Sequence, residues 1–171
     1  MSDTDTRIRE ELLTTAVENW LEDRNPFSDI VFKRGLIDEV TGRLEDVDKT
    51  DVAYNWKLMT EEGYFRKRGK SRRITAKEID EAVNFEVDVP LEEEVQTEIL
   101  RMLAEAERED VNYPMVSRDE LIKNLDYDPK LIDYNLFYCR SKGWVDVGVY
   151  ISSNPWEDAE ITKFGRDMVD V

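Results

Sequence analysis

The chain matches itself when its sequence is shifted by 80 residues. Four identities fall within eighteen aligned positions, and a shared apolar pattern underlies them. Each copy is long enough for a small domain, so we expect two tandem domains, residues 1–86 and residues 87–171. The identities are Asp48 with Asp128, Tyr54-Asn55 with Tyr134-Asn135, and Gly63 with Gly143.

An apolar stripe at helical spacing lies inside each copy. Its members fall at positions i, i+4 and i+7, which places them on one face of a helix. Each stripe leads to a glycine suited to the left-handed position after a helix, and the glycine leads into an aromatic residue that starts a strand. The stripes are Val52, Trp56 and Met59 in the first copy, and Ile132, Leu136 and Cys139 in the second.

The elements around this helix also repeat. Ser117 with Glu120, and Thr75 with Glu78, have the spacing of capping boxes that open helices, and Pro90 suits a first helical turn. Tyr64-Phe65, a turn around Gly69 and Ile74-Thr75 predict a hairpin over 64–75, and alternating apolar residues predict a second over 145–162. Residues 84–94 are expected to form the junction. The predicted order is helix, helix, helix, hairpin, helix, twice. The helices upstream of the two stripes are expected within residues 8–21, 36–44, 91–106 and 117–126.

This order resembles the winged helix-turn-helix superfamily of DNA-binding domains. The resemblance covers most of the chain as two copies, and it implies a mainly α fold with small β-hairpins (α+β). It also implies that the third helix of a copy enters the major groove while the hairpin, or wing, touches the neighbouring backbone. The segments that carry it are Gly63-Tyr64-Phe65 with Ile74-Thr75, and Gly143-Trp144-Val145 with Ile161-Thr162-Lys163-Phe164-Gly165.

Charge is distributed unevenly over the two copies. The chain has 24 basic and 40 acidic residues, a net charge of −16, and the acidic residues are spread along its length. This composition resembles that of cytoplasmic proteins of salt-accumulating archaea. An ordinary acidic protein is the alternative. Residues 1–86 carry a net charge of −5, and residues 87–171 carry −11.

A basic cluster in the first hairpin is the strongest functional signal. Six cations within eight positions repel one another, so an anion is needed to offset them, and nucleic-acid phosphate is the natural candidate. A solvated hairpin neutralised by nearby carboxylates is the alternative. The predicted phosphate contacts are Arg66, Lys67, Arg68, Lys70, Arg72 and Arg73.

The predicted third helix of the first copy has a polar face opposite its apolar stripe. Its short and basic side chains suit a DNA groove, although an ordinary solvated face would look similar. The residues expected to approach the groove are Lys49, Thr50, Tyr54 and Lys57.

The second copy carries carboxylates on its hairpin, which would repel phosphate. We therefore expect the second domain to pair with another protomer or a protein partner through aromatic residues, unless these side chains pack into the domain. The expected partner-binding residues are Tyr134, Phe137, Tyr138 and Trp156.

Enzymatic function is not expected. The sequence has no histidine, no phosphate-binding glycine loop and no metal-ligand spacing, and neither a cofactor nor a metal is expected. The single cysteine, Cys139, lies on the apolar stripe and is expected in the core, with redox sensing as the alternative. No apolar run approaches the roughly 20 residues of a membrane span, and no signal sequence is seen, so a cytoplasmic protein is expected.

These observations together favour a transcription regulator that binds double-stranded DNA. The alternatives are an acidic tandem winged-helix adaptor in a protein complex, and a replication initiator of a plasmid or virus.

Overall fold

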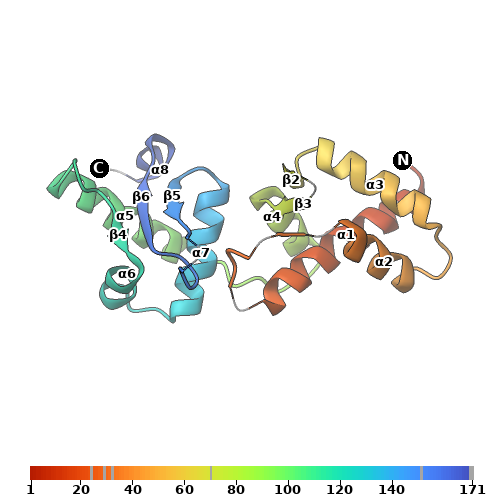
Figure 1. Cartoon of the computed structure of the whole chain (residues 1–171), viewed down its shortest axis with the longest axis horizontal. Helices are drawn as coiled ribbons and strands as arrows, with labels where there is room; N and C mark the ends of the chain where they lie inside the picture. The colour runs from red at the N-terminus through yellow and green to blue at the C-terminus, as the bar shows by residue number, and fades with distance from the viewer. Residues whose placement is uncertain (24, 29, 32, 70, 151, 170–171) are drawn as a thin grey trace. The chain divides into compact units, whose positions relative to one another are not determined.

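The computed structural model describes residues 1–23, 25–28, 30–31, 33–69, 71–150 and 152–169. Within these residues the chain is mainly helical with two small antiparallel sheets, so the expected α+β class is confirmed (Figure 1). The chain divides into two compact units. Unit 1 comprises Met1–Arg24 and Ser28–Val89, and unit 2 comprises Pro90–Val171 together with the short segment Asn25–Phe27.

Side-chain caps define where the helices of unit 1 begin. Ser2 and Asp5 form a reciprocal capping box at the first helix, and the Asp48 carboxylate accepts a hydrogen bond from the Thr50 amide at the third. The elements are α1 (Asp3–Glu22), β1 (Ile30–Val31), α2 (Lys33–Arg43), α3 (Lys49–Glu61), β2 (Phe65–Arg68), β3 (Ser71–Ile74) and α4 (Ala76–Asn84).

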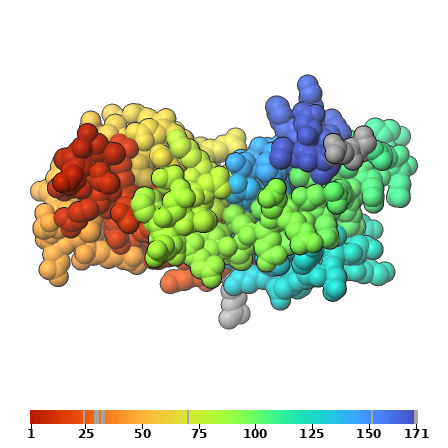
Figure 2. Space-filling view, turned by 180° about the vertical axis from the view of Figure 1, so that it is seen from behind, coloured from red at the N-terminus to blue at the C-terminus, as the bar shows by residue number. Residues whose placement is uncertain are grey.

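The sheet of unit 1 has the strand order β1-β3-β2, and both pairings are antiparallel. Phe65 and Ile74 are paired across the hairpin and both are buried. Helices α1, α2 and α3 pack around a common core, and α4 packs against α1, beside whose N-terminal residues it lies in Figure 2. The core includes Ile8, Leu12, Val40, Val52, Trp56 and Ile79.

Unit 2 repeats this topology. Its sheet has the order β4-β6-β5, so in each unit the last strand in sequence lies in the middle. The reciprocal capping box predicted at Ser117 and Glu120 opens α6 as expected. The elements are α5 (Glu93–Glu109), β4 (Val116–Ser117), α6 (Arg118–Asn124), α7 (Pro129–Ser141), β5 (Val145–Gly148), β6 (Asp158–Ile161) and α8 (Lys163–Met168).

A buried asparagine ties the long first helix to the third helix in both units. The Asn55 Oδ1 atom accepts a hydrogen bond from Arg9 Nε (3.0 Å), and its Nδ2 atom donates to the Asp51 carbonyl (3.1 Å). The equivalent Asn135 accepts from Gln96 Nε2 (3.0 Å) and donates to the Leu131 carbonyl (2.8 Å). The 80-residue repeat is therefore a repeat of hydrogen bonds as well as of residue types.

A threonine closes the turn after the third helix in both units. The Thr75 hydroxyl donates to the Gly63 carbonyl (3.1 Å), and the Thr162 hydroxyl donates to the Gly143 carbonyl (2.6 Å). Both glycines have positive φ, +87° and +76°, as predicted, which a residue with a Cβ adopts only with strain.

Several local predictions are wrong. Pro90 precedes the N-cap of α5, Glu92, and so is not in its first turn. The box at Thr75 is only half formed, because the Glu78 side chain turns into the core, where neither carboxylate oxygen has a hydrogen-bond partner. The short strands β1 and β4 were not predicted.

Among the described residues, no helix is both long and apolar enough to cross a membrane.

Candidate nucleic-acid interface

Helix α3 has one buried face and one exposed face. Val52, Trp56 and Met59 are buried, as the helical spacing predicted. The opposite face carries the residues expected at a groove, and Tyr54 is 58% exposed. The exposed residues are Lys49, Thr50, Tyr54 and Lys57.

Carboxylates of the same unit partly neutralise this exposed face. The Lys49 ammonium forms an ion pair with Asp38 and lowers the pKa of that carboxyl group. The Lys57 ammonium lies 3.8 Å from Glu61, one helical turn further along. Such exposed pairs contribute little to stability, so a competing anion can displace them at low cost. The face nevertheless offers little net positive charge.

The hairpin of β2 and β3 is held firmly against α3. The rings of Trp56 in α3 and Phe65 in β2 lie 4.3 Å apart between centroids. The Thr75 hydroxyl also donates to the Tyr64 carbonyl (2.8 Å), which fixes the strand where it leaves the turn. The hairpin therefore has a defined position relative to the exposed face of α3.

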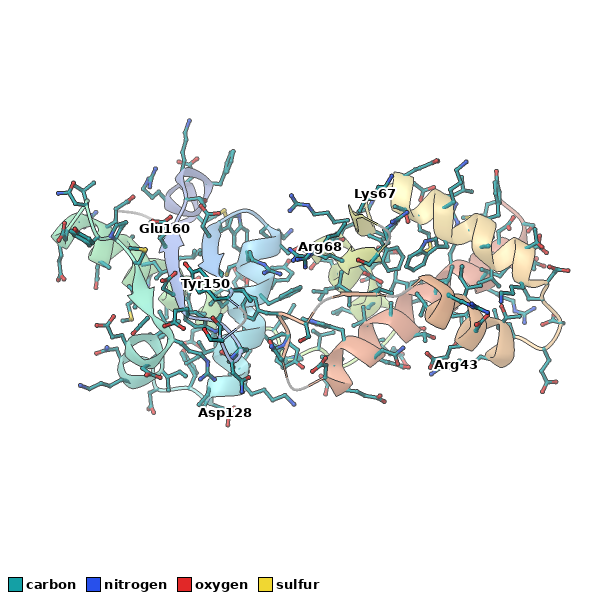
Figure 3. All side chains as sticks on the ribbon, viewed as in Figure 1. Arg43, Lys67, Arg68, Asp128, Tyr150 and Glu160 are labelled. Carbon is teal, nitrogen blue, oxygen red and sulfur yellow. The ribbon has the colours of Figure 1, made fainter. Side chains whose placement is uncertain are left out.

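Three cations of the hairpin are exposed and unpaired. Arg66, Lys67 and Arg68 follow the buried Phe65 along β2, and Figure 3 labels the last two on the hairpin. None of the three forms an ion pair with any residue that the structure describes. The alternative in which nearby carboxylates neutralise the hairpin therefore does not hold for these residues.

The strand register places like charges opposite each other. Arg66 pairs with Arg73, and Lys67 pairs with Arg72. Like charges directly opposite one another destabilise a strand pair by up to about 1 kcal/mol. The pair of Lys67 and Arg72 therefore lowers the stability of the unit unless an anion binds there.

The remaining predicted phosphate contacts are less accessible. Arg72 and Arg73 are only half exposed, because β3 is the central strand between β1 and β2. The Arg72 Nη1 atom donates to the Ser71 carbonyl (3.0 Å), and its Nε atom is buried without a hydrogen bond. Lys70, also predicted as a contact, lies outside the described residues.

The aromatic residues expected to bind a partner are buried instead. Helix α7 is covered along its whole middle part, so the positions opposite its apolar stripe are not outward-facing as the helical pattern had suggested. The Trp156 Nε1 atom donates to Asp133 Oδ1 (2.8 Å), and Arg118 forms a two-bond ion pair with the same carboxylate. The buried residues are Tyr134, Phe137, Tyr138 and Trp156.

Phe27 explains part of this burial. It comes from the segment of residues 25–27 that belongs to unit 2, and its ring meets that of Phe137 edge-on at 5.6 Å. The Arg140 guanidinium lies over both rings, at 4.8 Å and 5.0 Å. No local sequence signal linked residue 27 to a helix more than one hundred positions away.

The second hairpin presents a different surface from the first. Asp146 and Glu157 are exposed. Tyr150, which follows β5 and is labelled in Figure 3, is exposed, whereas Trp156 is buried. Phosphate would be repelled here, so the two hairpins are not electrostatically equivalent.

Cys139 lies in the core of unit 2, as the apolar stripe predicted. Burial raises the pKa of its thiol to about 12, which keeps it protonated at neutral pH. Among the described residues, no group of three acidic or cysteine side chains is arranged to hold a metal ion.

Comparison with known proteins finds no matching family, no matching curated protein and no matching solved structure.

Proposed function

We propose that the protein binds double-stranded DNA as a transcription regulator and that its two units are winged helix-turn-helix domains. The observation that carries this proposal is the set of three exposed, unpaired cations, Arg66, Lys67 and Arg68, on a hairpin anchored to the half-exposed helix α3. A chain with net charge −16 gains no stability from concentrating positive charge in this way.

The repeated topology supports the winged-helix interpretation. Each unit has a helix, a short strand, two helices, a hairpin and a closing helix, in the order implied by the resemblance but with one additional strand. The third helix of unit 1 keeps its polar face exposed, which an interface with a DNA groove requires.

The two parts of the interface have different roles in this proposal. The hairpin cations contact phosphates and supply affinity that does not depend on sequence. Thr50 and Tyr54 on α3 lie on the face that approaches the base edges, where hydrogen bonds and apolar contacts can discriminate sequences. Lys49 and Lys57 exchange their carboxylate partners for phosphate.

Fluorescence anisotropy with duplexes of unrelated sequence tests the proposal. The variant Arg66→Gln/Lys67→Gln/Arg68→Gln should bind every duplex more weakly by a similar factor, because it loses phosphate contacts only. The matched control is Arg108→Gln/Lys123→Gln/Lys163→Gln, which removes three exposed cations from unit 2. Equal DNA affinity of the hairpin variant and the control would reject the assignment.

The acidic adaptor remains the second candidate function. The observation that favours it is the net charge of −11 in residues 87–171 together with the exposed carboxylates of the second hairpin. Co-purification of the native protein distinguishes the two, because an adaptor would retain a stoichiometric protein partner with no enriched DNA.

A further inference from the structure

An arginine at the end of α2 forms a carboxylate cluster with α1 in unit 1. The Arg43 Nη1 atom donates to Glu11 (3.1 Å), Thr15 (3.1 Å) and Glu18 (3.4 Å), and its Nη2 atom donates to Glu39 (2.9 Å). Figure 3 labels this residue. These contacts, led by the hydrogen bond to Glu11, raise the pKa of Arg43. The surface of α1 is thus built to hold a guanidinium group.

Helix α5 presents the corresponding carboxylates in unit 2. Arg9 and Gln96 make the same hydrogen bond to the buried asparagine, which fixes the register between α1 and α5. The buried residues Ile8, Leu12 and Ala16 of α1 have buried equivalents on α5 in this register, namely Val95, Ile99 and Leu103. The equivalent positions are Glu11 with Glu98, Thr15 with Met102, Glu18 with Glu105, and Glu22 with Glu109.

Within the described residues of unit 2, no cation of α6 pairs with these carboxylates. Helix α6 ends at Asn124, and a short connection leads to Asp128, the N-cap of α7. In the described part of the chain, neither Glu105 nor Glu109 forms an ion pair. Two of the carboxylates that hold Arg43 in unit 1, Glu11 and Glu18, are therefore kept in unit 2 as Glu98 and Glu105 without a cation from α6.

These carboxylates border an open groove between α5 and α6. It has a volume of about 500 Å³, and Met102, Val116 and Leu125 contribute apolar surface. Arg101 also lines the groove, but its side chain is exposed and forms no ion pair with a described residue.

Tyr127 contacts Glu98, one of the carboxylates that line the groove. Its hydroxyl group donates to Glu98 (3.0 Å). Burial, this hydrogen bond and neighbouring glutamates raise its pKa to about 12, as expected for a site that favours positive charge.

We propose that this groove binds the β2–β3 hairpin of a second copy of the chain, with an arginine side chain held by Glu105, the equivalent of the Glu18 that Arg43 contacts in unit 1. The charges are complementary on both sides, because the exposed hairpin cations and the groove residues Glu105 and Glu109 form no ion pair with any residue that the structure describes. The contact joins unlike surfaces and is therefore head-to-tail. It goes beyond the proposed DNA binding, with which it competes for the hairpin.

Sedimentation velocity of two complementary variants of the full chain tests this contact. Arg66→Gln/Lys67→Gln/Arg68→Gln keeps the groove, and Glu105→Gln/Glu109→Gln keeps the hairpin. At about 0.1 M salt, where exposed charges are only partly screened, the unchanged chain should self-associate. Each variant alone should associate at least about tenfold more weakly, since it loses charge-assisted contacts.

Mixing the two variants in equal amounts should restore association as a one-to-one complex, because one intact groove then meets one intact hairpin. The control Glu93→Gln/Glu157→Gln, which neutralises two exposed glutamates outside the groove, should associate like the unchanged chain. Circular dichroism should show that all variants fold, because the substituted side chains lie on the surface.

A monomeric unchanged chain, association that survives in either variant, or a mixture that stays monomeric would overturn the proposal. If Arg101 closed the groove within its own chain, the unchanged chain would be monomeric. The variant Glu105→Gln/Glu109→Gln should bind DNA at least as tightly as the unchanged chain, because it keeps the hairpin and loses only the competing contact, so failure of the self-association proposal is distinguishable from failure of DNA binding.

Discussion

Replacing the buried Asn135 by alanine should destabilise unit 2 strongly. This side chain joins the beginning of α5 to α7 through four hydrogen bonds, and it is fully buried. The donors to its Oδ1 atom are the Glu92 amide (2.9 Å) and Gln96 Nε2 (3.0 Å). The acceptors of its Nδ2 protons are the carbonyls of Leu131 (2.8 Å) and Pro90 (3.2 Å).

The free energy of unfolding should fall by about 3–5 kcal/mol. Each of the four hydrogen bonds contributes about 1 kcal/mol, and the buried donors that lose their partner add a further cost. In unit 1, Asn55→Ala removes fewer bonds, and its partners Arg9 and Asp5 reach solvent more easily. We expect about 2–3 kcal/mol there.

Hydrogen exchange followed by mass spectrometry measures both effects, because peptides from α5 and α7 report on unit 2 separately from unit 1. The control is Asn124→Ala, an exposed asparagine whose Nδ2 atom donates to the Glu120 carbonyl. It should change stability by less than about 0.5 kcal/mol. If Asn135→Ala cost no more than this control, the asparagine would not be the structural link that the repeat implies.

Two further predictions concern single side chains. Burial raises the pKa of Glu78 well above its ordinary value of 4.5. The unchanged protein therefore loses folding stability as the pH rises above that value. In urea unfolding, the free energy of unfolding of Glu78→Gln should therefore rise relative to that of the unchanged protein as the pH goes from 5 to 8. The same difference between the two proteins at both pH values would contradict this assignment. Tyr54→Ala should reduce discrimination between DNA sequences by about tenfold or less without changing the salt dependence of binding, since it removes a contact to bases and no charge. Competition binding at two salt concentrations checks this, and a changed salt dependence would place Tyr54 elsewhere.

Features set by local chemistry could be predicted from the sequence. The buried stripe of α3 follows from helical spacing, and the helix start at Ser117 follows from the capping box. Gly63 and Gly143 adopt the left-handed conformation because a helix ends and a strand begins there without room for a longer turn. The topology of the hairpins follows from the same signals.

Features set by long-range packing could not be predicted in this way. The strands β1 and β4 have two residues each, which is too short for an alternating pattern. Phe137 looks exposed from the spacing of α7, and Trp156 looks exposed from the carboxylates around it in the second hairpin. Partners from distant segments bury both residues. The correspondence between the carboxylates of α5 and those that hold Arg43 depends on the register of α1 against α5. The hydrogen bonds of the two buried asparagines define this register, and the sequence alone does not.

The dependence of DNA affinity on salt concentration tests the assignment of the hairpin most directly. Each phosphate contact contributes about 0.9 to the slope of the logarithm of the binding constant against the logarithm of salt concentration. Removing the charges of Arg66, Lys67 and Arg68 should therefore make the slope shallower by about 2.7, while the three-cation control in unit 2 leaves it unchanged. A slope that is the same in the hairpin variant and the unchanged protein would contradict the assignment of this hairpin to the DNA backbone.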